Sequence, residues 1–552
     1  MEEKKTNRKY PRSSGVLLSI TMLHGPFGIG VLGKEALEFI DFLSGAGFHI
    51  WQVLPIEHTG ESFSPYKCIS AYAGEPMLID PRMLLDMKLI TKDELNDRVV
   101  GLSDDYVDYE QVREKQWKLL RKAFSRISEK KENITQNGNT SHTGDTAIAP
   151  GDASNKPRYT IPTKWISSKS TSQIPASYKQ FKPSWIDSYI LYMALRHRFD
   201  DKPWYEWPDE KLRAHDADAI RMVKTECRDE FDFHRFVQWL FYIQWTRIKE
   251  YAAKHDVAIV GDMPFYVSED SVEVWSARNL FNADSDGGFL AVAGAPPDYF
   301  SPLGQHWGNP IYNWRLMKKN SYRWWVRRVK AAIERYDHVR IDHFRGFESY
   351  WSIPADAPDA TTGVWVNGPG IALFRTLESA LANTNLPLIA EDLGDTHGNV
   401  DKLLSDTGLR GMRVLQFGFL GDDKHLPHSF TEDCIAYTGT HDNTTMLAWL
   451  FELTPEDRES ALFYLGFDGD WTQGGPNSSV NKAWIRLLFT SSASVAIVPI
   501  QDLLGYGADT RTNTPGTPEG NWRFRIRSGA LDDIDSVFYK ALVKASDRDN
   551  TL

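Results

Sequence analysis

The chain has 552 residues, of which 41% are hydrophobic, and a formal net charge of -11 at neutral pH. This length allows a large core, and the acidic balance disfavours nucleic acid and other phosphate-rich partners. Three scattered cysteines, Cys68, Cys227 and Cys434, exclude a disulfide framework or a cysteine zinc site. The N-terminus lacks a secretory signal, and no apolar run reaches the roughly 18 residues of a membrane span. We therefore expect a cytoplasmic protein without membrane contact, or a plastid protein if a transit peptide has been removed.

Short apolar runs, most of them bounded by turn residues, predict strands along the chain. They cover Val16–Leu18, Ile50–Leu54, Val257–Val260, His338–Ile341, Leu388–Ala390, Met412–Leu415, Ile435–Tyr437 and Val495–Val498. Several runs are almost continuously apolar, which is typical of parallel strands covered on both faces. Apolar residues recur at helical spacing between them, for example in residues 37–43 and 236–243. The alternation predicts an α/β fold, a (β/α)8 TIM barrel.

The predicted strands are unevenly spaced, so we expect one catalytic barrel over residues 1–552 that carries long insertions. Residues 60–235 far exceed one strand-helix unit and are interpreted as a mostly helical subdomain. Within them, residues 132–173 are polar and without periodicity, which predicts a long loop. Residues 264–318 are rich in Gly, Pro and aromatic residues and are expected to form the rim of an active site.

Four acidic motifs follow predicted strands and contain Asp262, Asp342, Glu391 and Asp442. The C-terminal ends of barrel strands face the active site. A single carboxylate there could cap the following helix, but four in phase with the strands predict a catalytic site. Cleavage of a glycoside requires a nucleophilic carboxylate and a proton-donating carboxylic acid, about 5–5.5 Å apart in a retaining enzyme. Adjacent strands could supply this separation.

Three of these acidic motifs belong to a larger ordered set of motifs, and the set spans the chain from Ser14 to about Arg525. They are Ser64-Pro65-Tyr66, residues 295–301, residues 304–310, residues 340–347, residues 390–394, residues 438–443, Pro515-Gly516-Thr517 and Gly520-Asn521-Trp522. This set resembles the 4-α-glucanotransferase family (amylomaltase, or disproportionating enzyme) of the α-amylase clan. One departure is Glu75, which stands where the family usually has Asn, so we expect a changed hydrogen bond near the acceptor side.

The resemblance implies roles for the charged residues. Asp342 would be the nucleophile, Glu391 the general acid and then the general base, and Asp442 a third carboxylate that grips sugar hydroxyls. Arg340 lies two residues before Asp342 on the same strand face and would keep it ionised. The pKa of Glu391 would need to be raised by burial so that it starts protonated. Asp262 would stabilise the neighbouring site residues without contacting the substrate itself.

Substrate contacts are expected from the loops around the barrel mouth, because the apolar faces of sugar rings stack on aromatic planes. His441 is expected to hydrogen-bond the sugar, with a satisfied core histidine as the alternative. His343 is a candidate whose face could also point away from the pocket. The other candidates are the loop aromatics Tyr66, Tyr299, Phe300 and Trp307 and the polar residues Ser64, Asp298, Asn309 and Asn513.

The resemblance implies a retaining transferase without cofactor or metal. It would move α-1,4-glucan segments from a donor malto-oligosaccharide to the 4-OH of an acceptor glucan or glucose through a covalent glycosyl-enzyme. A hydrolase of the same clan would use the same carboxylates, whereas a transferase must also hold an acceptor and exclude water. The presence of Arg340 and all three carboxylates disfavours a non-catalytic glucan-binding barrel. A metal-dependent barrel would require clustered ligands, which the sequence does not offer.

Overall fold

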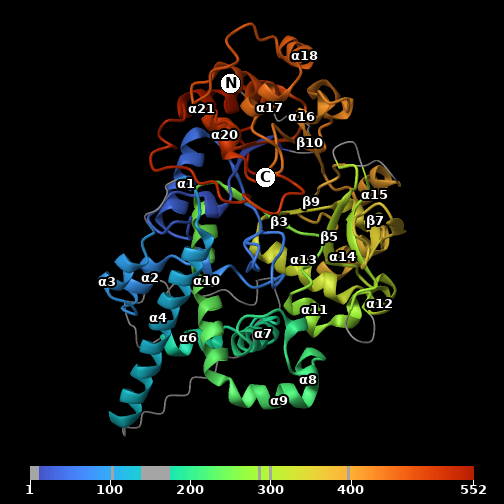
Figure 1. The fold of residues 1–552 in the computed structure, drawn as a ribbon. Coiled ribbons are helices and arrows are strands. Elements are labelled where there is room, and N and C mark those ends of the chain that lie inside the picture. The colour runs from blue at the N-terminus through green and yellow to red at the C-terminus, as the bar shows by residue number, and fades with distance from the viewer. Residues whose placement is uncertain (1–10, 101–104, 138–173, 284–287, 298–300, 395–397) are drawn as a thin grey trace.

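A computed structural model describes residues 11–100, 105–137, 174–283, 288–297, 301–394 and 398–552 (Figure 1). Its centre is an all-parallel sheet of eight strands in the order β10-β11-β12-β1-β2-β3-β6-β9. One parallel bridge between Ile389 and Arg410 joins the two ends of this order, so that the sheet is nearly closed into a barrel. The strands are β1 (Ser13–Leu17), β2 (Ile50–Gln52), β3 (Ala258–Met263), β6 (His338–Ile341), β9 (Leu388–Ala390), β10 (Gly411–Val414), β11 (Cys434–Tyr437) and β12 (Val495–Pro499).

All eight predicted strands are confirmed, and they form the predicted barrel. Their ends differ by a few residues: β1 begins at Ser13, and β2 ends at Gln52 although apolar residues continue beyond it. Every residue of β1, β3 and β12 is buried. Burial on both faces explains the nearly continuous apolar runs in the sequence.

The register of β3, β6 and β9 determines which side chains meet at the barrel mouth. Asp262 on β3 pairs with Arg340 on β6, and Ile341 pairs with Ala390 at the end of β9. Asp342 and Glu391 therefore follow paired residues of two neighbouring strands, which lie about 4.8 Å apart in a sheet.

Amphipathic helices cover the outside of the barrel. Helix α1 (Lys34–Ala46) buries Phe39, Ile40 and Leu43 against it and ends at Gly47, whose φ of 81° suits the left-handed cap. Later units contribute α13 (Arg323–Arg335), α14 (Ile371–Leu381), α15 (Val400–Thr407), α16 (Leu415–Gly418), α17 (Met446–Glu452), α18 (Pro455–Leu465), α19 (Ser479–Thr490), α20 (Ile500–Leu504) and α21 (Ser536–Ala545).

The described part of the chain between β2 and β3 is mainly helical. It contains α2 (Pro81–Asp86), α3 (Lys92–Asp97), α4 (Tyr109–Asn137), α6 (Ile174–Gln180), α7 (Ile186–Arg198), α8 (Glu210–Arg213), α9 (Ala217–Glu226) and α10 (Arg228–Lys254). Helices α4 and α10 contact each other, and Figure 1 shows both extending from the barrel toward α6 and α7. Residues 138–173, most of the predicted polar loop, lie outside the described residues. Division of the chain into a barrel and a subdomain remains a prediction.

A second, four-stranded antiparallel sheet lies beside the barrel and was not predicted. Its order is β5-β4-β7-β8, and its strands are β4 (Ala291–Ala295), β5 (Gln305–Pro310), β7 (Ser349–Pro354) and β8 (Val364–Asn367). Two of its strands fall in the predicted rim insertion, together with α11 (Val272–Ser276), while α12 (Trp314–Lys319) spans its end. The expected loop position of Trp307 is wrong, because this residue lies on β5.

Candidate active site

A cavity of about 1230 Å³ opens at the C-terminal ends of β6, β9 and β11. It brings together most of the residues predicted from the sequence, although they come from segments far apart in the chain. The predicted residues that line it are Ser64, Tyr66, Trp307, Asn309, Asp342, His343, Glu391, His441, Asp442 and Asn513. Three further candidates, Asp298, Tyr299 and Phe300, lie outside the described residues.

Behind the cavity, a buried arginine links two aspartates. Nη1 of Arg340 donates to both carboxylate oxygens of Asp262, at 2.8 and 2.7 Å, and lies 3.1 Å from Oδ1 of Asp342. The hydroxyl of Tyr66 donates to Oδ2 of Asp262 at 2.8 Å. Only 3% of the Arg340 side chain and none of Asp262 is exposed, whereas 29% of Asp342 is. Asp262 thus anchors Arg340 and Tyr66 while Asp342 reaches the cavity.

Glu391 is held by backbone N–H groups on both sides. The N–H of His343 donates to Oε2 at 2.7 Å, and the N–H of Leu393 donates to Oε1 at 2.8 Å. His343 adopts a left-handed conformation with φ of 50°, which is uncommon for a residue other than glycine. The neighbouring Asp392 points toward β10 instead, where it accepts from the N–H of Met412 at 2.6 Å. Glu391 and Asp392 therefore face different surroundings, as strand alternation requires.

Burial raises the pKa values of both Asp342 and Glu391. The Arg340 guanidinium opposes this shift for both groups, and the N–H groups of His343 and Leu393 oppose it further for Glu391. Nearby carboxylates add to the shift of both groups. Two interacting carboxyls titrate as a pair and favour a state that shares one proton. Arg340 contacts Asp342 directly, and no described ion pair reaches Glu391. This asymmetry favours the proton on Glu391 and the negative charge on Asp342.

Asp442 lies on the segment that follows β11 and is held by residues from the C-terminal part of the chain. Nδ2 of Asn513 donates to Oδ1 of Asp442 at 2.6 Å, and Nη2 of Arg511 donates to its backbone carbonyl at 2.7 Å. The neighbouring His441 stacks on Tyr66, with ring centroids 5.2 Å apart. Burial lowers the pKa of His441, so its ring is neutral at pH 7 and can donate or accept one hydrogen bond.

His343 is among the residues that line the cavity, although the Nε2 end of its ring is buried. Its ring stands perpendicular to Trp307, with centroids 5.0 Å apart. Its Nε2 is buried and has no hydrogen-bond partner among the described residues, and burial lowers its pKa to about 3. Nδ2 of Asn309 donates to the carbonyl of Val267 at 2.9 Å, which holds β5 against the segment after β3.

Further cavity residues were not among the predicted site residues. Residues 514–523 form a large part of the lining, and Tyr266, Gln305 and His306 contribute to it. Trp522 contacts both Tyr66 and His441, with ring centroids 5.7 and 5.8 Å apart. The motif Gly520-Asn521-Trp522 was a detectable signal, but its position over the barrel mouth depends on the tertiary fold. In the described part of the chain, no group of three His, Cys, Asp or Glu side chains could hold a metal ion.

Within the described residues, no helix combines the length and apolar character needed to cross a membrane.

Residues 18–144 and 158–531 match the family model described as 4-alpha-glucanotransferase. The chain is 37% identical to the 4-alpha-glucanotransferase of Thermus thermophilus over 543 residues, which cover 98% of this chain and 99% of the relative. It is 38% identical to that of Aquifex aeolicus over 519 residues, covering 94% and 96%.

The fold agrees with a solved structure, the amylomaltase from Streptococcus agalactiae in complex with acarbose. The TM-score is 0.85 at 35% sequence identity, and the match covers 97% of this chain and 99% of that one. Sequence and structure agree over nearly the full length of both proteins. The chain therefore belongs to the 4-alpha-glucanotransferase family.

Proposed function

We propose that this 4-α-glucanotransferase moves α-1,4-glucan segments by double displacement, with Asp342 as nucleophile, Glu391 as acid and base, and Asp442 as transition-state stabiliser. The observation that carries the assignment is the unequal environment of the paired carboxyls. Asp342 contacts the Arg340 guanidinium at 3.1 Å, whereas Glu391 is buried and accepts only backbone N–H groups in the described structure. The adjacent cation favours a carboxylate at Asp342, whereas burial raises the pKa of Glu391 despite its two N–H donors and suits it to be the carboxylic acid.

In the first step, Asp342 attacks the anomeric carbon of the donor while Glu391 gives its proton to the leaving 4-oxygen. The bond between sugar and leaving chain breaks as a glycosyl ester with Asp342 forms. Positive charge develops on the sugar ring, and the Asp442 carboxylate lies in the same cavity to stabilise it. Asn513 and Arg511 hold Asp442, so that this charge is positioned before the reaction begins.

In the second step, Glu391 takes the proton of an acceptor 4-OH, and the acceptor oxygen displaces Asp342. Transfer requires that a sugar rather than water occupies the acceptor position. The cavity is large enough for several sugar residues, and the segment 514–523 and strand β5 line it. Malto-oligosaccharides would serve as donor and acceptor, and family membership favours transfer over hydrolysis.

The remaining predicted residues are proposed as substrate contacts. Tyr66 and Trp307 present aromatic faces to the cavity, and His343 lines it beside Trp307. His441, Ser64, Asn309 and the undescribed Asp298, Tyr299 and Phe300 complete this proposal. We assign the protein to the cytoplasm, or to a plastid after removal of a transit peptide, because its three cysteines are free thiols, as in reducing compartments.

The test uses purified enzyme and maltotriose, without added cofactor or metal. We expect glucose to appear together with maltopentaose and longer chains. Asp342→Ala should make none of these products, while the control Asp401→Ala, an exposed carboxylate at the start of α15, should retain them. Glucose and maltose without longer chains would refute transfer. Full activity of Asp342→Ala would refute the assigned nucleophile.

A further inference from the structure

Two adjacent residues after β12, Gln501 and Asp502, lie where two distant chain segments approach Asp442. They occupy the first turn of α20 (Ile500–Leu504), and both are buried. One segment, residues 438–446, carries Asp442 itself. The other, residues 510–513, supplies the side chains that hold it.

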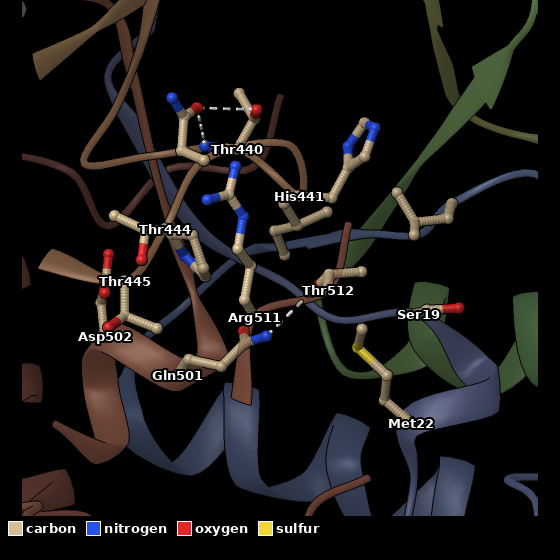
Figure 2. A pocket seen from close by; sticks show the side chains of 14 residues that line it. Ser19, Met22, Thr440, His441, Thr444, Thr445, Gln501, Asp502, Arg511 and Thr512 are labelled. Atoms are coloured by element: carbon tan, nitrogen blue, oxygen red, sulfur yellow. Dashed lines mark hydrogen bonds between the residues drawn. The ribbon is translucent and has the colours of Figure 1, made fainter. Parts of the chain in front are cut away.

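Asp502 binds both ends of the first segment. Oγ1 of Thr438 donates to its Oδ2 at 2.5 Å, and the backbone N–H of Met446 donates to its Oδ1 at 2.8 Å. Within the segment, the N–H and hydroxyl of Thr440 donate to Oδ1 of Asn443, both at 2.9 Å (Figure 2). The segment is therefore a closed turn whose two ends meet at one carboxylate.

Gln501 binds the second segment. Its Nε2 donates to the carbonyl of Thr510 at 3.1 Å and to Oγ1 of Thr512 at 3.0 Å, and Figure 2 shows the latter contact. Arg511 lies between these two threonines, and Asn513 follows Thr512. The side chain of Arg511 donates to the backbone carbonyl of Asp442, and that of Asn513 donates to its carboxylate. One turn of helix thus connects to both sides of the same catalytic carboxylate.

A small cavity of about 20 Å³ lies between these groups, and Asp502, Gln501, Arg511 and His441 are among the residues that line it (Figure 2). In close-packed cores, side chains are held by contact on all sides. Here the cavity leaves a small gap in the packing around Thr444, whose buried Oγ1 has no hydrogen-bond partner among the described residues. The hydrogen bonds of Gln501 and Asp502 therefore add directional restraint to the packing that holds the two segments.

The charge on Asp502 is not balanced by a cationic partner in the described part of the chain. Only 1% of this residue is exposed, and none of the ion pairs among the described residues includes it. Burial raises its pKa to about 6, which means that folding disfavours its ionised form. A carboxylate at this position is explained by two converging donors, which it accepts at once and more strongly than a neutral group would.

We infer that Gln501 and Asp502 are positioning residues, which hold the segments 438–446 and 510–513 so that the Asp442 carboxylate points into the cavity. This inference rests on the proposed role of Asp442. Neither residue lines the large cavity, so both act through Asp442 and not through the sugar.

The test is Asp502→Asn, which preserves size but replaces one acceptor oxygen with an amide donor. A displacement of about 1 Å can lower turnover roughly 100-fold, so we expect kcat for maltotriose to fall about tenfold or more. KM should stay within about twofold, because the sugar contacts are retained. Thr438→Val, which removes the donor at the other end of that bond, should give the same pattern and provides a second variant if Asp502→Asn folds poorly.

A structural effect is separated from positioning by two comparisons. Asp80→Asn changes a second buried aspartate that accepts a backbone N–H, that of Arg82 at 2.9 Å, and that does not line the cavity. It should lower the melting temperature without lowering kcat. The second comparison is a double-mutant cycle that combines Asp502→Asn with Asp442→Asn. The activity of each variant is measured as fluoride release from α-maltotriosyl fluoride.

If Asp502 acts through Asp442, its substitution should cost less than about threefold in the Asp442→Asn background. Equal losses in both backgrounds, or wild-type kcat for Asp502→Asn and Thr438→Val, would overturn the inference. Wild-type activity of Asp442→Asn alone would instead refute the proposed function, so the two failures are distinguishable.

Discussion

Replacement of Arg340 by methionine tests the electrostatic basis of the site. The variant keeps most of the side-chain volume but removes the charge between Asp262 and Asp342. At the observed 3.1 Å, and with an effective dielectric constant of about 20, the attraction between Arg340 and Asp342 is roughly 5 kcal/mol. That corresponds to about three to four pKa units for Asp342. We expect turnover at pH 7 to fall on the order of 1000-fold, because the nucleophile becomes protonated.

The same substitution should change how stability depends on pH. Removal of one partner from a buried ion pair typically costs about 3–5 kcal/mol. Burial raises the pKa of Asp342 above its unfolded value, and loss of the guanidinium raises it further, so the folded variant binds a proton more readily than the unfolded chain. The loss of stability should therefore be larger at pH 8 than at pH 5, because it grows as the pH rises toward the raised pKa of Asp342. Urea unfolding at both pH values, with maltotriose turnover alongside, measures this.

Arg413→Met is the matched control. Arg413 lies on β10, and its guanidinium is 3.2 Å from the carboxylate of Asp392. It forms no ion pair with Asp342 among the described residues. It should lower stability while maltotriose turnover is retained. Equal losses of stability at pH 5 and pH 8 for Arg340→Met, or turnover close to that of Arg413→Met, would contradict the electrostatic argument.

Three further predictions concern individual cavity residues. Glu391→Gln should lose maltotriose turnover but still release fluoride from α-maltosyl fluoride, because fluoride leaves without a proton. Because burial raises the pKa of Glu391, wild-type turnover should decline as pH rises through that pKa, and the variant's fluoride release should lack this decline. Asn513→Ala removes a 2.6 Å hydrogen bond to Asp442 and should lower kcat roughly tenfold, or about 1.5 kcal/mol, with an unchanged melting temperature. Trp307→Ala should weaken maltotriose binding to inactive Asp342→Ala enzyme, as measured by calorimetry, and unchanged binding would remove Trp307 from the substrate contacts.

The barrel could be predicted because its strands are buried on both faces. Burial leaves an almost uninterrupted apolar run in the sequence, as at Val495–Pro499, and eight such runs define the sheet. Two of the proposed catalytic carboxylates, Asp342 and Glu391, follow directly from this pattern, since each comes immediately after a run, whereas Asp442 comes five residues after the end of β11.

The antiparallel sheet could not be predicted, because strands β4 and β5 leave no recognisable apolar pattern in the sequence. Strand β4 consists of Ala, Val and Gly, and β5 carries polar residues, so neither shows the alternation of a half-buried strand. Gly294 marks the close approach of these strands, because a Cβ there would lie 2.1 Å from the carbonyl oxygen of Gln305. Such proximity is a tertiary property without a local signature. The contact of Glu75 is also tertiary: it accepts from the N–H and the hydroxyl of Thr59, both at 2.8 Å, which only the folded chain brings together.

The pairing of β1 with β12 has a consequence for synthesis of the protein in the cell. Ser13 pairs with Val495, nearly five hundred residues later, so the first barrel strand waits for its neighbour. At about 5–20 residues per second, a ribosome needs roughly 25–100 s to make the intervening chain. During that time one edge of β1 has no partner strand, and apolar residues that are buried in the finished barrel remain accessible. Premature termination before Val495 therefore leaves a chain that cannot close its sheet and is a natural substrate for chaperones.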